Sequence, residues 1–135
     1  MANSSLRWGR IVLGALLAEF LLIVAVIPVY ASGAGQSALT TVAVVGSFIV
    51  FVPVAWWLAR PTSTPVLHGI LMGAFAALAY TLLSVIGRQF NADAPPTPWM
   101  YYVAHMLKLA GGATGGWMAA GAGSSKEKKV EVGGR

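Results

Sequence analysis

Two ionisable residues stand inside long apolar stretches of this chain, where a charge is costly. Glu19 lies in I-V-L-G-A-L-L-A-E-F at 11–20, and Lys108 lies in H-M-L-K-L-A at 105–110. A charged side chain at the centre of a membrane helix costs on the order of 2.5–3.5 kcal/mol on insertion scales, so each one needs a partner. Because the two residues carry opposite charges, the sequence predicts that they form a buried pair.

This predicted pair has two interpretations. In the first, it is a structural ion pair that fixes the order and register of the helices. Such a pair contributes little to the free energy of unfolding, but removing only one of its partners is strongly destabilising. In the second, it is a gate, in which Glu19 takes up a proton or a cation when Lys108 moves away. The structural interpretation is favoured, because a transport pathway usually contains more than one buried acid and the apolar stretches hold only Glu19.

The two histidines do not form a metal site in this interpretation. His105 is one helical turn before Lys108, where it either hydrogen-bonds to another helix or relays protons. His68 lies at a depth that differs from that of His105 by about 18 Å. Zinc needs three or four converging ligands and the chain has no cysteine, so we expect neither a metal nor another cofactor.

Known catalytic patterns are absent from the sequence. There is no Ser-His-acid arrangement, no H-E-x-x-H segment and no pair of catalytic carboxylates. We therefore expect a protein that is not an enzyme.

Four stretches of about 20 mainly apolar residues surround these side chains, and each is long enough to cross a membrane as a helix. The sequence predicts an all-α membrane protein with four transmembrane helices in an antiparallel up-down bundle, forming one domain over 1–122. Residues 123–135 are predicted to be a disordered cytoplasmic tail. In this bundle Glu19 and Lys108 differ in depth by only about 4 Å. The predicted spans are 11–30, 39–58, 66–86 and 99–120.

Composition and charge support a membrane location. Hydrophobic residues make up 57% of the 135 residues and charged residues only 10%, against roughly 25% in soluble domains. The net charge of +5 is a topology signal and not a nucleic-acid surface, since all but one of the basic residues outside the spans lie on one predicted side. Both termini are therefore expected in the cytoplasm of a bacterium, with the bundle in the inner membrane. The basic residues on that side are Arg7, Arg10, Arg60, Lys126, Lys128, Lys129 and Arg135, against Arg88 on the other.

The first apolar stretch has an alternative interpretation as a signal peptide. Arg7 and Arg10 precede it, and V-Y-A at 29–31 resembles a cleavage site. Its 20 residues exceed the usual 7–15 of a signal peptide's apolar region, and it contains Glu19. An uncleaved first span is favoured.

Glycines at helical spacing mark the third and fourth stretches. H-G-I-L-M-G-A at 68–74 and G-G-A-T-G-G at 111–116 contain G-x-x-x-G spacings, which let helix backbones approach closely. The pattern predicts tight packing, either within one protomer or against a second copy. The residues concerned are Gly69, Gly73, Gly111, Gly112, Gly115 and Gly116.

Two family resemblances extend these predictions. V-L-H-G at 66–69 and H-M-L-K-L-A-G-G-A-T-G-G at 105–116 resemble segments of small, uncharacterised four-span bacterial inner-membrane proteins, which implies a four-helix fold and no known activity. More weakly, G-A-L-L-A-E at 14–19 and A-Y-T-L-L-S-V-I-G at 79–87 are similar to segments of the small multidrug resistance transporters. That second resemblance implies that Glu19 couples transport to protons and that Tyr80 contacts the substrate.

The function predicted from the sequence is that of a structural or accessory inner-membrane protein. The bundle would be packed by its glycine faces and pinned by Glu19 and Lys108. The alternative is a small proton-coupled transporter that uses Glu19. The expected partners are the lipid bilayer and either a second copy or a larger membrane complex, and no nucleic acid.

Overall fold

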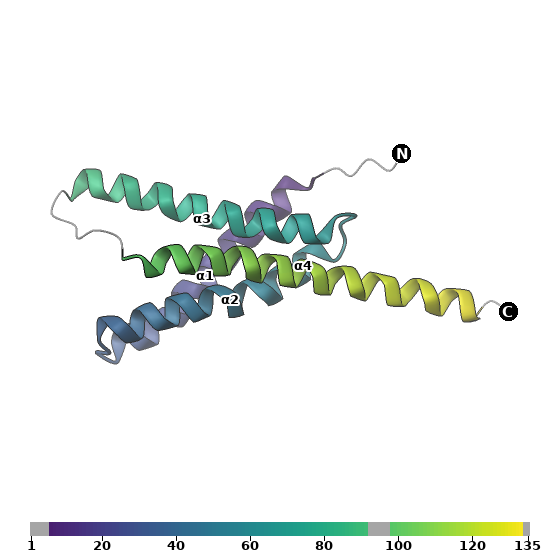
Figure 1. The fold of residues 1–135 in the computed structure, drawn as a ribbon, viewed down its shortest axis with the longest axis horizontal. Helices are drawn as coiled ribbons and strands as arrows, with labels where there is room; N and C mark the ends of the chain where they lie inside the picture. Colours follow the sequence, from purple (N-terminus) through teal and green to yellow (C-terminus); the bar gives the residue numbers. More distant parts are fainter. Residues whose placement is uncertain (1–5, 92–97, 134–135) are drawn as a thin grey trace.

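The computed structural model describes residues 6–91 and 98–133, with side chains up to residue 122. This part of the chain is helical and contains no strand, which confirms the all-α prediction (Figure 1). In chain order, the helices are α1 (Trp8–Ala31), α2 (Gln36–Ala59), α3 (Pro65–Phe90) and α4 (Met100–Gly133).

The helix ends follow local sequence rules. Pro65 is the first residue of α3, where its fixed φ suits a helix and its missing N–H is not needed. Gly33, just beyond α1, has a φ of 72° and donates its N–H to the carbonyl oxygen of Tyr30 at 3.1 Å. Such a left-handed residue after a helix is usually glycine because it lacks Cβ. Pro28 and Pro53 lie inside α1 and α2, which continue past them to Ala31 and Ala59.

Among the described residues, three helices are long and apolar enough to cross a membrane: α1, α2 and α3. The structure therefore supports three of the four predicted spans, and the fourth, 99–120, stays a prediction. His105, Lys108 and the glycines of 111–116 lower its apolar character. The packing explains why α4 can be less apolar than the other helices. It packs along both α2 and α3 and buries its glycines and Lys108 between them.

The end of α4 also differs from the prediction. The sequence predicts disorder over 123–135, whereas α4 continues as a helix to Gly133 and extends past the other three helices in Figure 1. Lys126, Glu127, Lys128 and Lys129 are good helix formers. Extending an existing helix avoids the cost of nucleating a new one, so these residues can add turns to α4.

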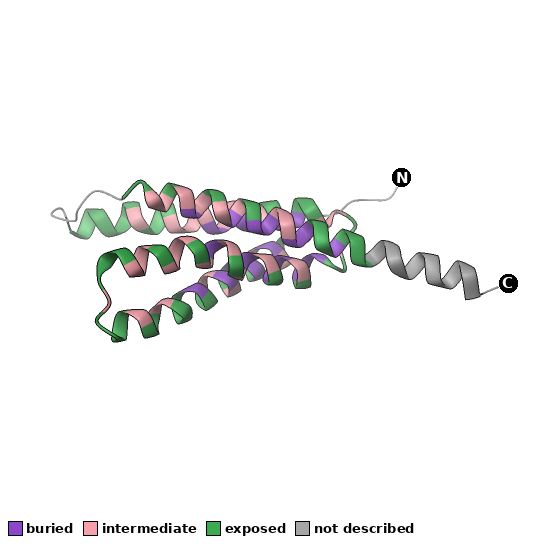
Figure 2. Ribbon diagram, turned by 60° about the horizontal axis from the view of Figure 1, so that its bottom comes forward, coloured by how far each residue is buried: buried purple, intermediate pink, exposed green. Residues whose placement is uncertain are grey.

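The core lies in one half of the bundle. Its buried residues come from the first half of α1, the second half of α2 and the first half of α3. Figure 2 shows the buried positions gathered there and in the middle, while the opposite helix ends are mostly intermediate or exposed. The helices therefore pack tightly at one end and loosely at the other. The core residues are Ile11, Ala15, Ala18, Phe51, Val54, Ala55, Leu58, Met72 and Ala76.

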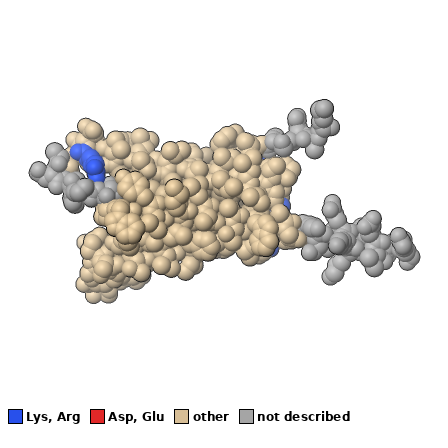
Figure 3. All heavy atoms as spheres, in the orientation of Figure 1, with Lys and Arg blue, Asp and Glu red and all other residues tan. Residues whose placement is uncertain are grey.

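The outer surface is apolar over the length of the helices. Large side chains such as Leu13, Ile49 and Leu78 are exposed on three helices. On the face shown in Figure 3, Lys and Arg atoms appear only toward the two ends of the described surface, and no Asp or Glu atoms are visible. Exposing so large an apolar surface to water is unfavourable, whereas lipid chains would cover it. The tail residues Lys126, Lys128, Lys129 and Arg135 and the loop residue Asp93 lie outside the part whose side chains are described.

Candidate functional site

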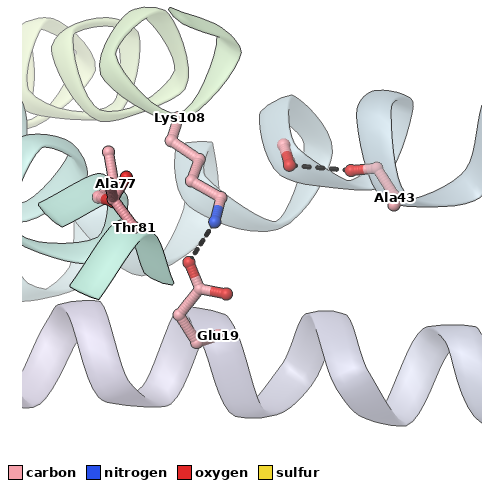
Figure 4. A network of polar contacts seen from close by, with 6 residues as sticks. Glu19, Ala43, Ala77, Thr81 and Lys108 are labelled. Carbon is pink, nitrogen blue, oxygen red and sulfur yellow. Dashed lines mark hydrogen bonds and ion pairs between the residues drawn. The ribbon is translucent and has the colours of Figure 1, made fainter. Parts of the chain in front are cut away.

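The two charged residues inside the helices meet in the middle of the bundle. Lys108 Nζ on α4 forms an ion pair with Glu19 Oε1 on α1 (Figure 4). Lys108 is only 3% exposed, whereas Glu19 is 23% exposed. The lysine is therefore enclosed by protein, while the carboxylate keeps an open side.

This ion pair crosses a gap between helices. Among the described residues, no Cα of α1 lies within 8 Å of a Cα of α4, although both helices pack against α2 and α3. The two side chains together bridge the distance that the backbones leave. The pair is therefore the polar link between α1 and α4.

Aromatic rings surround the ammonium group of Lys108. Its Nζ lies 5.9 Å from the ring centroid of Phe51 on α2 and 5.2 Å from that of Tyr80 on α3. Such rings attract a cation through their negative faces, more strongly where water is excluded. All four helices thus contribute a group to the surroundings of the ion pair.

A cluster of polar aromatic residues continues from the ion pair toward the loosely packed end of the bundle. Tyr80 stacks on Tyr101 with ring centroids 5.6 Å apart, and the ring of His105 meets Tyr80 edge-on at 5.2 Å. His105 Nδ1 is buried and has no hydrogen-bond partner among the described residues. An unpaired buried nitrogen costs free energy, so a ligand or a water molecule there would be favourable.

A cavity of about 880 Å³ fills the loosely packed half of the bundle. All four helices line it, and its lining includes Glu19 and Lys108. Most of the lining is apolar, with large side chains such as Phe20, Ile23 and Leu39. This volume is within the range of small-molecule sites, roughly 300–1,000 Å³. The ion pair is thus part of a cavity wall and not sealed in a dry core.

Ser47 is a buried residue near the site that sequence reasoning missed. It is 0% exposed, lines the cavity from α2 and donates its hydroxyl to the carbonyl oxygen of Ala43 at 2.7 Å (Figure 4). A single small hydroxyl in an apolar stretch is common in membrane helices, where it bonds back to its own helix. The sequence around Ser47 therefore carries no signal that separates it from Thr40 and Thr41, whose hydroxyls bond back to their own helix in the same way but at exposed places.

His68 lies far from the ion pair, at the tightly packed end. Its Nδ1 lies 2.9 Å from the carbonyl oxygen of Thr64, and its Nε2 accepts the backbone N–H of Arg7 at 3.1 Å. Since a carbonyl only accepts, Nδ1 must carry the proton and Nε2 must be free of one. His68 thus holds the start of α1 against the start of α3. Nearby, Arg10 donates to the carbonyl oxygen of Leu58 at the end of α2 at 3.3 Å.

The predicted glycine positions are used inside the protomer. A Cβ on Gly73 would come within 2.6 Å of the Lys108 carbonyl oxygen on α4, and Gly69 and Gly112 face each other in the same way. On the neighbouring side of α4, a Cβ on Gly111 would come within 2.9 Å of the Phe48 carbonyl oxygen on α2. Gly115 likewise faces α2, and Gly116 faces the start of α3. The paired glycines therefore allow α4 to approach two helices at once.

No group of three or more His, Cys, Asp or Glu side chains converges within the described parts of the chain. Comparisons of the chain with protein-family models, with curated proteins and with solved structures give no match. Both family resemblances therefore stay predictions.

Proposed function

We propose that the chain is a small integral membrane protein of structural or accessory type, in which Glu19 and Lys108 hold α1 to α4. Three helices are long and apolar enough to cross a membrane. We further propose that α4 crosses with them, as the fourth member of an antiparallel bundle in a bacterial inner membrane. Both termini would lie in the cytoplasm, since Arg7, Arg10 and Arg60 are at one end and Arg88 is at the other.

The observation that carries this proposal is the ion pair across the gap. α1 and α4 have no close backbone contact, so the side-chain link decides how far apart they stand in the loosely packed half. A lone charge left in this place would be poorly solvated, because Lys108 is almost fully enclosed. Removing one partner of a buried pair is strongly destabilising, whereas replacing both by neutral residues is often close to neutral.

The test is a double-mutant cycle in lipid bicelles. Glu19→Gln alone should lower the free energy of unfolding by about 3–5 kcal/mol, because Lys108 then lacks its counter-ion. Glu19→Gln combined with Lys108→Met should return to within about 1 kcal/mol of the unsubstituted protein. A double variant that loses as much free energy of unfolding as the two single variants together would contradict a structural role for the ion pair.

The cavity favours a second candidate function, a small proton-coupled transporter that uses Glu19. The open side of this carboxylate faces a volume large enough for a small molecule, and Tyr80 and His105 line the same volume. This candidate predicts pH-dependent flux in proteoliposomes that Glu19→Gln abolishes while the variant stays folded. Absence of flux for a broad panel of compounds would count against it.

Neither candidate includes a catalytic step. A second copy or a larger membrane complex is proposed as a partner, and it would bind the exposed apolar outer surface. The glycine faces are already occupied by α2 and α3. If the partner is a second copy, cross-linking of Leu78→Cys, at an exposed residue of the outer surface, should trap a dimer.

A further inference from the structure

His68 uses both of its ring nitrogens at the tightly packed end of the bundle. Nδ1 donates to the carbonyl oxygen of Thr64 at 2.9 Å, and Nε2 accepts the backbone N–H of Arg7 at 3.1 Å. The residue is only 4% exposed. A neutral imidazole has one donor and one acceptor, so these two partners match its capacity. The contact therefore requires His68 to be neutral.

The partner of Nε2 is the residue at which α1 starts. Arg7 is the N-cap of α1, and its carbonyl oxygen accepts the N–H groups of Arg10 and Ile11 at 2.9 and 3.3 Å. In many helices a glutamate or glutamine three residues after the N-cap accepts the N–H of the N-cap residue. In α1 that position is Arg10, whose side chain has no acceptor. The ring of His68 supplies the missing acceptor from α3.

Protonation of the ring would turn this acceptor into a donor. A protonated imidazole carries an N–H on both nitrogens, so Nε2–H would face the N–H of Arg7. The Arg7 N–H would then lose its partner in a partly buried place. Leaving such a donor unpaired is unfavourable. One proton on His68 therefore breaks this bond between α1 and α3.

The surroundings of the ring do not compensate a positive charge. From α1, Arg10 lines the same small cavity as His68, and its volume of about 10 Å³ leaves room for at most one water molecule. The first turn of α3 has no acidic residue, and the start of a helix is the positive end of its dipole. On the α4 side, the contacts at the start of α3 are made by glycines, which carry no charge. The α2 residues that line the cavity are Ala55, Leu58 and Ala59, and none of them titrates.

The other charged side chains described at this end of the bundle are basic as well. Arg7 is exposed, and Arg60, just after α2, stacks its guanidinium group over Trp56 at 3.3 Å. Glu19 is the one acidic side chain among those that the structure describes, and it is paired with Lys108. From Arg7 to Glu19, α1 rises about 18 Å at 1.5 Å per residue. No carboxylate described here is close enough to hold a protonated His68.

We propose that His68 is a pH-sensitive switch, which holds the start of α1 against α3 when it is neutral and releases residues 7–10 when it is protonated. Histidine is the side chain whose charge ordinarily changes between pH 5 and 8, and such changes drive many pH sensors. Ile11 and Met72 belong to the hydrophobic core, which keeps the rest of α1 in place. In the proposed topology this end faces the cytoplasm, so the switch responds to cytoplasmic pH. The inference holds whether the Glu19–Lys108 pair is structural or a gate.

The experiment measures solvent exchange of the Arg7 amide by NMR, using the full ¹⁵N-labelled chain in bicelles at pH 7.5 and pH 5. Rates are expressed as protection factors, which removes the pH dependence of the exchange chemistry itself. Protection of Arg7 should fall roughly ten-fold at pH 5, as expected for the loss of one partly buried hydrogen bond. The Gly33 amide is the internal control, because its N–H bonds to the carbonyl oxygen of Tyr30 at the other end of the bundle. Its protection should stay the same.

Two matched variants identify the group that responds to pH. His68→Gln keeps a side-chain acceptor for the Arg7 N–H but does not titrate, so it should retain protection at both pH values. His105→Gln removes the other histidine and should leave the ten-fold fall unchanged. In the unsubstituted protein, the ¹⁵N shifts of the His68 ring should change from the neutral to the protonated form over the pH range in which protection falls.

Four results would overturn the proposal. Equal protection of the Arg7 amide at pH 7.5 and pH 5 would show that acid does not release α1. A fall that persists in His68→Gln, or one that disappears in His105→Gln, would assign the pH response to another group. A His68 ring that stays neutral down to pH 5 would exclude it as the switch, and this result does not depend on any variant being folded.

Discussion

Gly69 on α3 and Gly112 on α4 face each other so closely that a Cβ added to either one would meet the carbonyl oxygen of the other. The relation is reciprocal, so neither backbone has room to accept a side chain. Close approach of this kind is the usual role of glycines at helix contacts in membranes. It also explains why α4 carries polar and small residues where an outward-facing helix would carry large apolar ones.

The first prediction concerns this contact. Gly69→Ala or Gly112→Ala should lower the free energy of unfolding by about 1–3 kcal/mol, because the helices must move apart to accept the methyl group. Gly87→Ala is the control, since a Cβ there meets nothing within 4 Å. It should raise stability by roughly 0.5–1 kcal/mol, as expected for alanine inside a helix. Denaturation in bicelles measures all three, and equal effects of the three substitutions would contradict the close contact.

The second prediction separates the two candidate functions by reversing the ion pair. Glu19→Lys alone should prevent stable folding, because two ammonium groups would then face each other. Glu19→Lys with Lys108→Glu should recover much of the folded protein, since the attraction is restored with its direction reversed. Size-exclusion chromatography gives the folded fraction.

Flux measured on the same reversed variant tests whether transport needs a carboxylate at position 19. A structural pin needs only opposite charges, whereas the proposed transporter needs a carboxylate at position 19, on the more exposed side of the pair. Flux that persists in the reversed variant would exclude Glu19 as the coupling residue.

The third prediction concerns His68 at the tightly packed end. His68→Ala should cost about 1–3 kcal/mol, because the backbone N–H of Arg7 would lose its acceptor in a partly buried place. Thr40→Ala is the control, since its exposed hydroxyl bonds only within its own helix. Hydrogen exchange at the Arg7 amide reads out the same contact, and it should speed up in His68→Ala but not in Thr40→Ala. Unchanged exchange in both would mean that the histidine does not hold α1.

The helices and the contact between Glu19 and Lys108 could be predicted from the sequence, because both follow from the free-energy cost of placing polar groups in a membrane. A charge in an apolar stretch needs a counter-charge at the same depth, and helix rise gives that depth. The cavity could not be predicted, since the loose packing at one end depends on how side chains of four helices fill space together. For the same reason, the glycine spacing could not distinguish packing within one protomer from packing against a second copy. The structure shows that the glycines of α4 pack against α2 and α3 of the same protomer.

The bond between His68 and Arg7 lay beyond prediction for a different reason. A histidine at the start of a helix has many possible acceptors and donors nearby, and the backbone N–H of Arg7 is 61 residues away in sequence. The lower apolar character of the fourth stretch has a physical cause too. Counting apolar residues treats every helix as surrounded by lipid, whereas α4 lies between two other helices.

The fourth prediction tests the topology, and the lack of cysteine makes it simple. Ser32→Cys places a thiol in the connection between α1 and α2, and Ser63→Cys places one in the connection between α2 and α3; both positions are exposed. If both termini are cytoplasmic, a membrane-impermeant maleimide added to intact spheroplasts should label Ser32→Cys and not Ser63→Cys. Labelling of both after lysis is the control for thiol reactivity. The opposite pattern would invert the proposed orientation and place the loosely packed end of the bundle on the cytoplasmic side.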